Sequence, residues 1–349
     1  MAGGGSDTTM NLMIFGAGYS GQAIAASCAA LATTALRNPD GDDSPERAYA
    51  PVAASAVSTS IVPGASIASR TSGSLSALRA AHPVIAGTTR ARDKAAKLAE
   101  AGIRPFVFDG ANLSDDLRVH LLDVTHLVQS IAPGREGDPL LRLTGDDLKR
   151  LMPKLQWIGY LSTVGVYGDH QGGWVDEETV CRPVSARSVE RVEAENAWMA
   201  LGKQHNLPVC VLRLSGIYGP GRNAFCNLAN GTARRLIKPG QVFNRIRVED
   251  IGTATAFLIV KNLSGIFNVT DDEPCPPQDV VLEAAQLMSM PVPPEQDFAS
   301  AELSAMARSF YGENKRVSNA KLKALGFGFR YPNYRGSLTD LWTGGRWRG

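Results

Sequence analysis

The feature that most limits the fold is a glycine turn between a short apolar run and a long uncharged run. Residues 12–15 are apolar and suit a buried strand, and residues 22–36 are Ala-rich and suit a helix. Between them, Gly16, Gly18 and Gly21 form the pattern G-x-G-x-x-G. In this context the pattern is typical of dinucleotide binding, because glycine permits a tight turn, a close approach of backbone to pyrophosphate, and close helix–strand packing. The pyrophosphate would lie at the positive end of the helix. A glycine-rich turn without a ligand is the alternative.

The composition is that of a soluble globular chain and excludes several classes of function. The 349 residues are 44% hydrophobic and 20% charged with a net charge of +2, so neither nucleic acid nor an anionic membrane is expected as a partner. The five cysteines are scattered without C-x-x-C spacing, which indicates reduced thiols and a cytoplasmic location. The sequence holds no zinc pattern, so no metal is expected. Residues 12–36 are uncharged and long enough to span a bilayer, but their motif glycines favour a buried strand-turn-helix.

Alternating apolar and amphipathic segments predict the domain organisation. Between residues 83 and 214 strand and helix patterns alternate, which implies an α/β fold with a doubly wound parallel sheet of the Rossmann type. Residues 1–10 are expected to be a flexible tail, and residues 38–80, rich in Ala, Ser, Gly and Pro, a low-complexity insertion. We therefore expect an NAD(P)-binding domain over 11–215. Residues 216–349 would form mainly a smaller C-terminal substrate lobe, with some segments returning to the first domain.

The end of the second expected strand bears on which dinucleotide is bound. Sites that prefer NAD usually carry an acid there for the ribose diol, but residues 87–92 read Gly-Thr-Thr-Arg-Ala-Arg. The Thr89 hydroxyl and the Arg90 guanidinium suit a 2′-phosphate, which favours NADP over NAD. The alternative is that these arginines begin a solvated helix. Asp109 ends the next strand, where it can accept from the adenine amino group, although a turn-forming Asp-Gly pair explains it equally well.

Four motifs together resemble one family, the extended short-chain dehydrogenase/reductases, which include the NAD-dependent epimerase/dehydratases. They are the glycine turn at 16–21, Leu-Ser-Thr-Val-Gly-Val-Tyr-Gly at 161–168, Arg-Leu-Ser-Gly-Ile-Tyr-Gly-Pro-Gly-Arg at 213–222, and Arg-Ile-Arg-Val-Glu-Asp-Ile at 245–251. The resemblance covers nearly the whole chain and implies a Rossmann domain with a C-terminal substrate lobe. It also implies a catalytic Ser or Thr and a Tyr-x-x-x-Lys pair, in which lysine lowers the pKa of the phenol so that proton transfer accompanies hydride transfer.

The Tyr-x-x-x-Lys pair of that family is missing, so this sequence resembles the family's atypical members. Thr163 or Ser162 can supply the hydroxyl, but Arg187 stands where tyrosine is expected and Arg191 where lysine is expected. Arginine keeps its proton in proteins and cannot serve as acid or base. Arg191 can still hold the ribose or a phosphate. Tyr167 is another candidate phenol, with structural packing as its alternative.

The candidate site residues fall into three groups. Catalysis is assigned to Thr163, Ser162 and Tyr167. Cofactor binding is assigned to Gly16, Gly18, Tyr19, Ser20, Gly21, Thr89, Arg90, Asp109 and Arg191. The family often uses arginines on a nucleotide-sugar diphosphate, and the resemblance therefore makes substrate-binding candidates of Arg222, Arg316 and Asn319. For the last two, bonding to backbone carbonyls of the lobe is the alternative. The acids at 271–273 are expected to cap a helix or face water.

These features predict an NADP-binding oxidoreductase-type protein with a non-standard active site, acting on a small carbonyl or sugar-like substrate. Two alternatives stay open. The first is a non-catalytic NADP-binding sensor or scaffold, which the two arginines favour. The second is a nucleotide-sugar epimerase or dehydratase. The expected partner is a small-molecule substrate, and residues 189–198 offer a helix through which a homodimer can form.

Overall fold

The structure, a computed structural model, describes residues 9–37 and 83–349 of the chain. The low-complexity insertion predicted at 38–80 lies outside these residues, and so does most of the predicted tail. Of the last two tail residues, Met10 is buried and belongs to the main core. None of the helices in the described ranges is long and apolar enough to cross a membrane.

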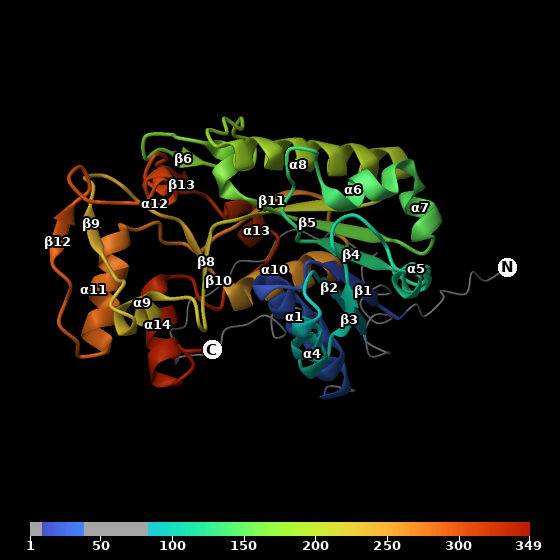
Figure 1. The fold of residues 1–349 in the computed structure, drawn as a ribbon, viewed down its shortest axis with the longest axis horizontal. Coiled ribbons are helices and arrows are strands. Elements are labelled where there is room, and N and C mark those ends of the chain that lie inside the picture. Colours follow the sequence, from blue (N-terminus) through green and yellow to red (C-terminus); the bar gives the residue numbers. More distant parts are fainter. Residues whose placement is uncertain (1–8, 38–82) are drawn as a thin grey trace, which may run out of the picture.

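A sheet of seven parallel strands lies at the centre of the described molecule (Figure 1), which confirms the predicted α/β fold. Its strand order is β11-β7-β5-β4-β1-β2-β3, so the order reverses beside β1. In open α/β sheets, ligands bind at such a switch point, beyond the carboxyl ends of the strands. The strands are β1 (Asn11–Phe15), β2 (Val84–Thr89), β3 (Arg104–Val107), β4 (His126–Gln129), β5 (Trp157–Thr163), β7 (Val209–Leu214) and β11 (Gly265–Val269).

Helices cover both faces of this sheet. Along β1, Leu12 and Ile14 join one core cluster while Met13 and Phe15 join the other, because successive side chains of a strand point to opposite faces. The first face is covered by α1 (Tyr19–Arg37), α4 (Asp93–Glu100) and α10 (Val248–Val260). The second is covered by α5 (Asp115–Leu121), α6 (Pro139–Thr144), α7 (Leu148–Leu151) and α8 (Ala186–His205), and the 3₁₀ turn η1 (Gly145–Asp147) joins α6 to α7.

A smaller group of elements lies beyond the edge strand β11, at the left of Figure 1. Its core gathers Phe225, Tyr334 and Trp347. Its elements are the paired strands β9 (Arg235–Ile237) and β12 (Glu295–Asp297), and the helices α9 (Ala224–Ala229), α11 (Pro277–Leu287), α12 (Ala305–Phe310) and α14 (Tyr334–Thr343). The paired strands β8 (Gly216–Tyr218) and β10 (Arg245–Arg247) pack their Ile217 and Ile246 side chains in the cluster of the large domain. A third ladder pairs β6 (Trp174–Val175) with β13 (Arg316–Val317), and α13 (Ala320–Ala324) follows it.

Two apolar segments after residue 215 pack with the large domain. Residues 256–260 end α10, whose side chains pack in the same cluster as those of α1. Residues 266–269 lie in β11, which pairs with β7 in the main sheet. The helix offered for a homodimer is partly turned inward, because Trp198 is fully buried and stacks on Tyr160 with ring centroids 6.3 Å apart. Val189 is exposed, and pairing through this helix stays a prediction.

The close packing of α10 on α1 gives a prediction for stability. A Cβ on Gly252 would come 2.4 Å from the Ala23 carbonyl oxygen and 2.5 Å from Oγ of Ser27. Gly252→Ala is therefore expected to push the two helices apart and lower the free energy of unfolding by about 1–3 kcal/mol. Gly336→Ala is the matched control, since its Cβ would meet only Asn333 Oδ1, at 3.6 Å. Urea unfolding checks both variants, and equal stabilities would contradict the expectation.

Candidate functional site

The glycine turn follows β1 at the switch point of the sheet. Gly16 has a φ of +83°, and a Cβ on it would come 2.9 Å from Cγ1 of Ile131. A Cβ on Gly21 would come 3.1 Å from Cγ2 of Ile14. Gly18 differs, because it is exposed and the nearest non-neighbouring atom to its Cβ would be the Gly16 carbonyl oxygen, at 4.0 Å. Two glycines therefore serve the turn itself, and the space beside Gly18 is open to a ligand.

The start of α1 presents N–H groups to that open space. The neighbouring strand β2 anchors the turn, since the Gly16 N–H donates to Thr88 Oγ1 at 2.8 Å. The helix begins at Tyr19, so the N–H groups of Tyr19, Ser20 and Gly21 belong to its first turn and have no acceptor within the helix. No acidic side chain stands in this first turn. The positive end of the helix dipole is therefore free to attract an anion.

The residues expected to select the dinucleotide lie at the ends of β2 and β3. Thr89 Oγ1 accepts from the Ala91 N–H at 3.3 Å. Arg90 is exposed, and within the described ranges its guanidinium has no hydrogen bond or ion pair. Asp109 Oδ1 accepts from the backbone N–H groups of Ala111 and Asn112, which hold the pKa of this exposed carboxyl below its usual value. The Asp109 side chain thus stabilises a turn, which is the alternative to its binding the adenine amino group. The Arg90 guanidinium remains available to a ligand.

The two hydroxyls at the end of β5 have different surroundings. Ser162 is buried and donates to Oε1 of Glu195 on α8. Thr163 is half-buried, and its Oγ1 accepts from the Gly165 N–H at 3.1 Å at the start of the 3₁₀ turn η2 (Val164–Tyr167). The proton of the Thr163 hydroxyl therefore remains available to another acceptor, whereas that of Ser162 is used inside the fold.

Glu195 and Arg213 form a buried ion pair that the sequence analysis did not single out. Nη2 of Arg213 lies 2.8 Å from Oε2 of Glu195, and both side chains are only 4% exposed. The signal available in the sequence was a lone arginine in the apolar strand Val-Cys-Val-Leu-Arg-Leu, because a buried charge needs a partner. Its partner lies on another element and has no signal of its own. The pair fixes Ser162 at the end of β5.

The structure places Tyr167 in a packing role. Its ring is fully buried with Val166, Val175 and Val317, and its hydroxyl donates to Asn268 Oδ1 at 2.8 Å. Burial raises the pKa of Tyr167 to about 12, so the phenol releases its proton less readily than a free tyrosine. These contacts favour the alternative of structural packing over catalysis.

The two arginines at the Tyr and Lys positions point to different places. Arg187 is exposed at the start of α8. Arg191 is half-buried, and its Nη1 donates to the Leu161 carbonyl at the end of β5 and to Tyr160 Oη at 3.3 Å. Arg191 therefore holds a fixed positive charge beside the strand that carries Thr163. Neither guanidinium can transfer a proton.

The three substrate-binding candidates do not come together. Arg222 lies over the ring of Tyr19, with the guanidinium carbon 5.1 Å from the ring centroid. Arg316 donates to the Gly172 carbonyl. The amide of Asn319 donates to the Thr270 carbonyl at 2.9 Å and to Asp272 Oδ1 at 2.7 Å. Arg316 and Asn319 therefore bond to backbone carbonyls within the fold, which is the alternative to substrate binding.

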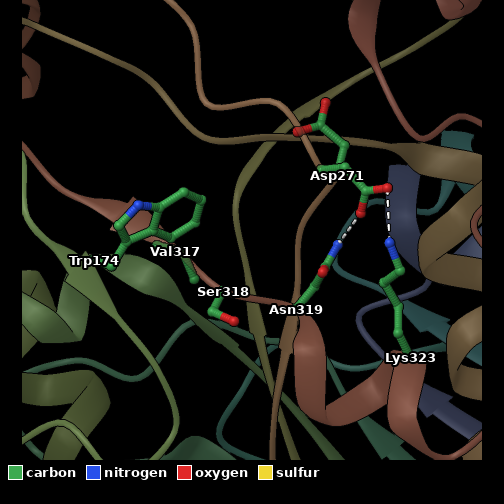
Figure 2. Close-up of a pocket in the computed structure, with 7 residues that line it drawn as sticks. Trp174, Asp271, Val317, Ser318, Asn319 and Lys323 are labelled. Carbon is green, nitrogen blue, oxygen red and sulfur yellow. Dashed lines mark hydrogen bonds and ion pairs between the residues drawn. The ribbon is translucent and has the colours of Figure 1, made fainter.

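Asn319 lies in the wall of a cavity of about 260 Å³ at the carboxyl end of β11 (Figure 2). Asp272 in this wall accepts from Asn319 and pairs with Nζ of Lys323 at 2.9 Å. The indole of Trp174 lies on the opposite side of the cavity, and it is 63% exposed. The residues that line the cavity are Trp174, Asp271, Asp272, Val317, Ser318, Asn319 and Lys323.

Asp271 is buried rather than capping a helix or facing water. It is 1% exposed, and its Oδ2 has no hydrogen-bond partner among the described residues. Burial raises the pKa of Asp271 to about 8, so the native protein binds a proton that the unfolded chain has already released. Stability is therefore expected to fall as pH rises from about 4 to 8. No cluster of three His, Cys, Asp or Glu side chains suited to a metal occurs in the described part of the chain.

The pKa of Asp271 gives a prediction with a definite sign. Asp271→Asn removes the cost of ionising a buried carboxyl, so the variant is expected to be more stable than the native chain at pH 9 by about 1–3 kcal/mol. Below pH 4 both forms carry a neutral side chain, and the gain should vanish. Asp272→Asn, at the exposed ion pair, is the control and should show no gain. Thermal unfolding across this pH range checks both variants, and a pH-independent difference would contradict the argument.

Comparisons with known proteins agree with this geometry. The sequence model of the NAD dependent epimerase/dehydratase family matches residues 150–260. A functionally unknown conserved protein from Silicibacter pomeroyi is 40% identical, with 96% of this chain and 99% of that chain covered and a TM-score of 0.75. The UDP-N-acetylglucosamine 4-epimerase of Bacillus cereus is 15% identical, with 97% and 100% covered and a TM-score of 0.63.

A third structure, the UDP-glucose 4-epimerase of Thermus thermophilus solved with NAD, is 18% identical, with 96% and 99% covered and a TM-score of 0.59. At this level of identity the two epimerases show the fold alone. No protein with a curated function matches the sequence.

Proposed function

From the match of residues 150–260 to the NAD-dependent epimerase/dehydratase family, we propose that this chain is an NADP-binding oxidoreductase of that family with a non-standard active site. Membership supports an NAD(P)-dependent oxidoreductase or epimerase-like enzyme. The observation that carries the proposal is the open space beside Gly18, in front of the first N–H groups of α1, since the nearest non-neighbouring atom of the described residues to a Cβ there would be the Gly16 carbonyl oxygen, at 4.0 Å. A pyrophosphate fits there, since it needs close backbone and free donors.

The residues around this turn have separable tasks in the proposal. The amides of Tyr19, Ser20 and Gly21 hold the pyrophosphate, and Arg191 fixes positive charge beside β5. The cofactor, when bound, gives or takes the hydride. Thr163 orients the substrate oxygen, because its own acceptor site is used by the Gly165 N–H and its proton is left to donate. We propose a small carbonyl or sugar-like compound as substrate.

Selection of NADP over NAD is proposed to depend on Arg90. A guanidinium that binds the 2′-phosphate adds a charge-assisted hydrogen bond worth about 1.5–3 kcal/mol. Arg90→Ala is therefore expected to weaken NADPH binding by about 10- to 100-fold and to leave NADH binding unchanged. Arg92→Ala is the control, because this arginine lies two residues further on and is also exposed. Calorimetric titration with both nucleotides checks the expectation, and an equal loss for NADPH and NADH would contradict it.

Turnover is the experiment that tests the enzyme proposal. Purified protein is expected to oxidise NADPH with a member of a panel of aldehydes, ketones and sugars, followed at the absorbance of reduced nicotinamide. Thr163→Ala should lower that rate while leaving NADPH affinity intact, because the hydroxyl acts on the substrate. Tight NADPH binding without turnover on any member of the panel would count against catalysis.

A second candidate function is a sensor or scaffold that binds NADP without turning it over. Three observations favour it: Arg187 and Arg191 replace the proton-transferring pair, Ser162 donates to Glu195, and Tyr167 is buried. It predicts cofactor affinity equal to that of an enzyme, no turnover, and no effect of Thr163→Ala on any measured property.

A nucleotide-sugar epimerase is the remaining candidate. Similar structures carry such names, and one of them was solved with UDP-glucuronic acid and NAD. An epimerase needs a tightly held NAD, which agrees poorly with an arginine at position 90. Mass spectrometry of the ligand that copurifies with the protein decides between them: NAD supports the epimerase and NADP the oxidoreductase.

A cytoplasmic location and a homodimer stay proposals, which cell fractionation and light scattering test.

A further inference from the structure

The loop at 219–223, which precedes α9 of the smaller lobe, contacts the start of α1. The hydroxyl of Tyr19 donates to the Pro220 carbonyl at 2.9 Å, and the guanidinium of Arg222 lies over the Tyr19 ring. Tyr19 directly follows Gly18, so this loop brings a cation to the helix end proposed for the pyrophosphate. Burial raises the pKa of Tyr19 to about 12, so the ring is neutral at pH 7 and does not compete for the cation.

The charge of Arg222 is not neutralised by the residues around it. Its side chain is exposed, and within residues 9–37 and 83–349 it forms no ion pair. Glu249 is the carboxylate close enough to raise the pKa of Tyr19, and it is therefore the acid to consider as a partner for Arg222. That carboxylate is held by Arg247 through two hydrogen bonds of 2.7 Å each. An anion placed at the start of α1 would therefore find a free guanidinium there.

The loop that carries Arg222 is firmly held. A Cβ on Gly219, whose φ is +154°, would come 2.7 Å from the hydroxyl of Tyr19. The amide of Asn223 donates to the carbonyls of Gly219 and Trp347, both at 2.7 Å. The Gly221 N–H donates to the same Trp347 carbonyl at 2.9 Å. The backbone beside Arg222 is thus fixed from both sides before any ligand binds, which lowers the entropy cost of using its side chain.

We propose that Arg222 binds the cofactor rather than the substrate: its guanidinium grips the pyrophosphate from the smaller lobe, and Tyr19 is its positioning residue. A guanidinium suits this task because its planar fork donates two parallel hydrogen bonds to phosphate oxygens. The cofactor would then bridge the two parts of the molecule, with the amides of α1 on one side and Arg222 on the other. This inference rests on the proposed NADP site and replaces the substrate role expected from the sequence.

The test compares two probes that share the 2′-phosphate but differ in the pyrophosphate. Arg222→Ala is expected to weaken NADPH binding by about 10- to 50-fold. Its affinity for adenosine 2′-monophosphate, which carries neither phosphate of the pyrophosphate, should stay within about twofold of the native value. Arg222→Lys should recover part of the loss. Arg348→Ala is the matched control, since this arginine lies over Trp347 near the same loop and should leave both affinities unchanged.

A double-mutant cycle tests the positioning role of Tyr19. Tyr19→Leu should weaken NADPH binding in the native background and add little in the Arg222→Ala background, because both changes remove one interaction. Losses that simply add would overturn the positioning role. If Arg222→Ala binds NADPH as tightly as the native protein does, the inference is overturned and the proposed function still stands. Native protein that binds neither probe refutes the proposed function as well. Unchanged thermal unfolding without ligand shows that each variant is folded.

Discussion

Glu195→Ala is expected to lower the free energy of unfolding by about 3–5 kcal/mol, because it leaves a buried guanidinium without its counter-charge. Arg213 is 4% exposed, and its Nε and Nη2 both donate to Glu195. The hydroxyl of Ser162 would also lose its acceptor. The end of β5, from which Thr163 projects, should therefore loosen together with the core. Urea unfolding followed by circular dichroism measures the loss.

Two further variants separate the lost ion pair from other causes. Asp147→Ala breaks an exposed pair with Arg150 and is expected to cost less than about 1 kcal/mol. The double variant Glu195→Leu with Arg213→Met replaces both charges by apolar side chains and should recover much of the stability lost in Glu195→Ala. If Glu195→Ala were no less stable than Asp147→Ala, the buried pair would not hold the strand end as argued.

Gly18→Val is expected to weaken NADPH binding by at least about 100-fold while the protein stays folded. The expectation depends on a contrast within one turn. A Cβ on Gly16 would meet Ile131 at 2.9 Å, whereas a Cβ on Gly18 would meet no non-neighbouring atom of residues 9–37 and 83–349 nearer than 4.0 Å. A side chain at Gly18 is therefore tolerated by the fold and occupies the space proposed for the pyrophosphate. Calorimetry gives the affinity, and thermal unfolding gives the stability.

A graded series makes this result sharper. Gly18→Ala adds a single methyl group and should fall between the native chain and Gly18→Val in affinity. Gly336→Ala, on α14, is the matched control and should bind NADPH like the native chain. If Gly18→Val bound NADPH with native affinity, no pyrophosphate would lie close to this turn, and the cofactor site would have to lie elsewhere.

The sequence predicted the fold well wherever a local pattern decides the structure. The apolar run, three glycines and Ala-rich run at the start became β1, the turn and α1, because each depends on neighbouring residues alone. The sequence did not show which segments after residue 215 return to the first domain, since an apolar segment such as 256–260 does not reveal which core it joins. It ends α10, which packs in the cluster of α1.

The candidate site was harder to predict, because its decisive contacts join distant residues. Ser162 and Glu195 are 33 positions apart, and the hydroxyl of Ser162 looks free until the fold brings the carboxylate to it. Tyr19 and Pro220 are 201 positions apart, so the place of Arg222 was beyond any local pattern. Asp271 shows the same limit, since its neighbours Asp272 and Glu273 suggest water and only the tertiary structure buries it.

Titration of the native protein with NADPH and NADH in a calorimeter tests the central claim most directly, because that claim concerns one dinucleotide site at the start of α1. The account predicts one molecule of NADPH per chain, bound at least about tenfold more tightly than NADH. Heat for neither nucleotide would contradict the dinucleotide site, and tighter binding of NADH would contradict the part given to Arg90.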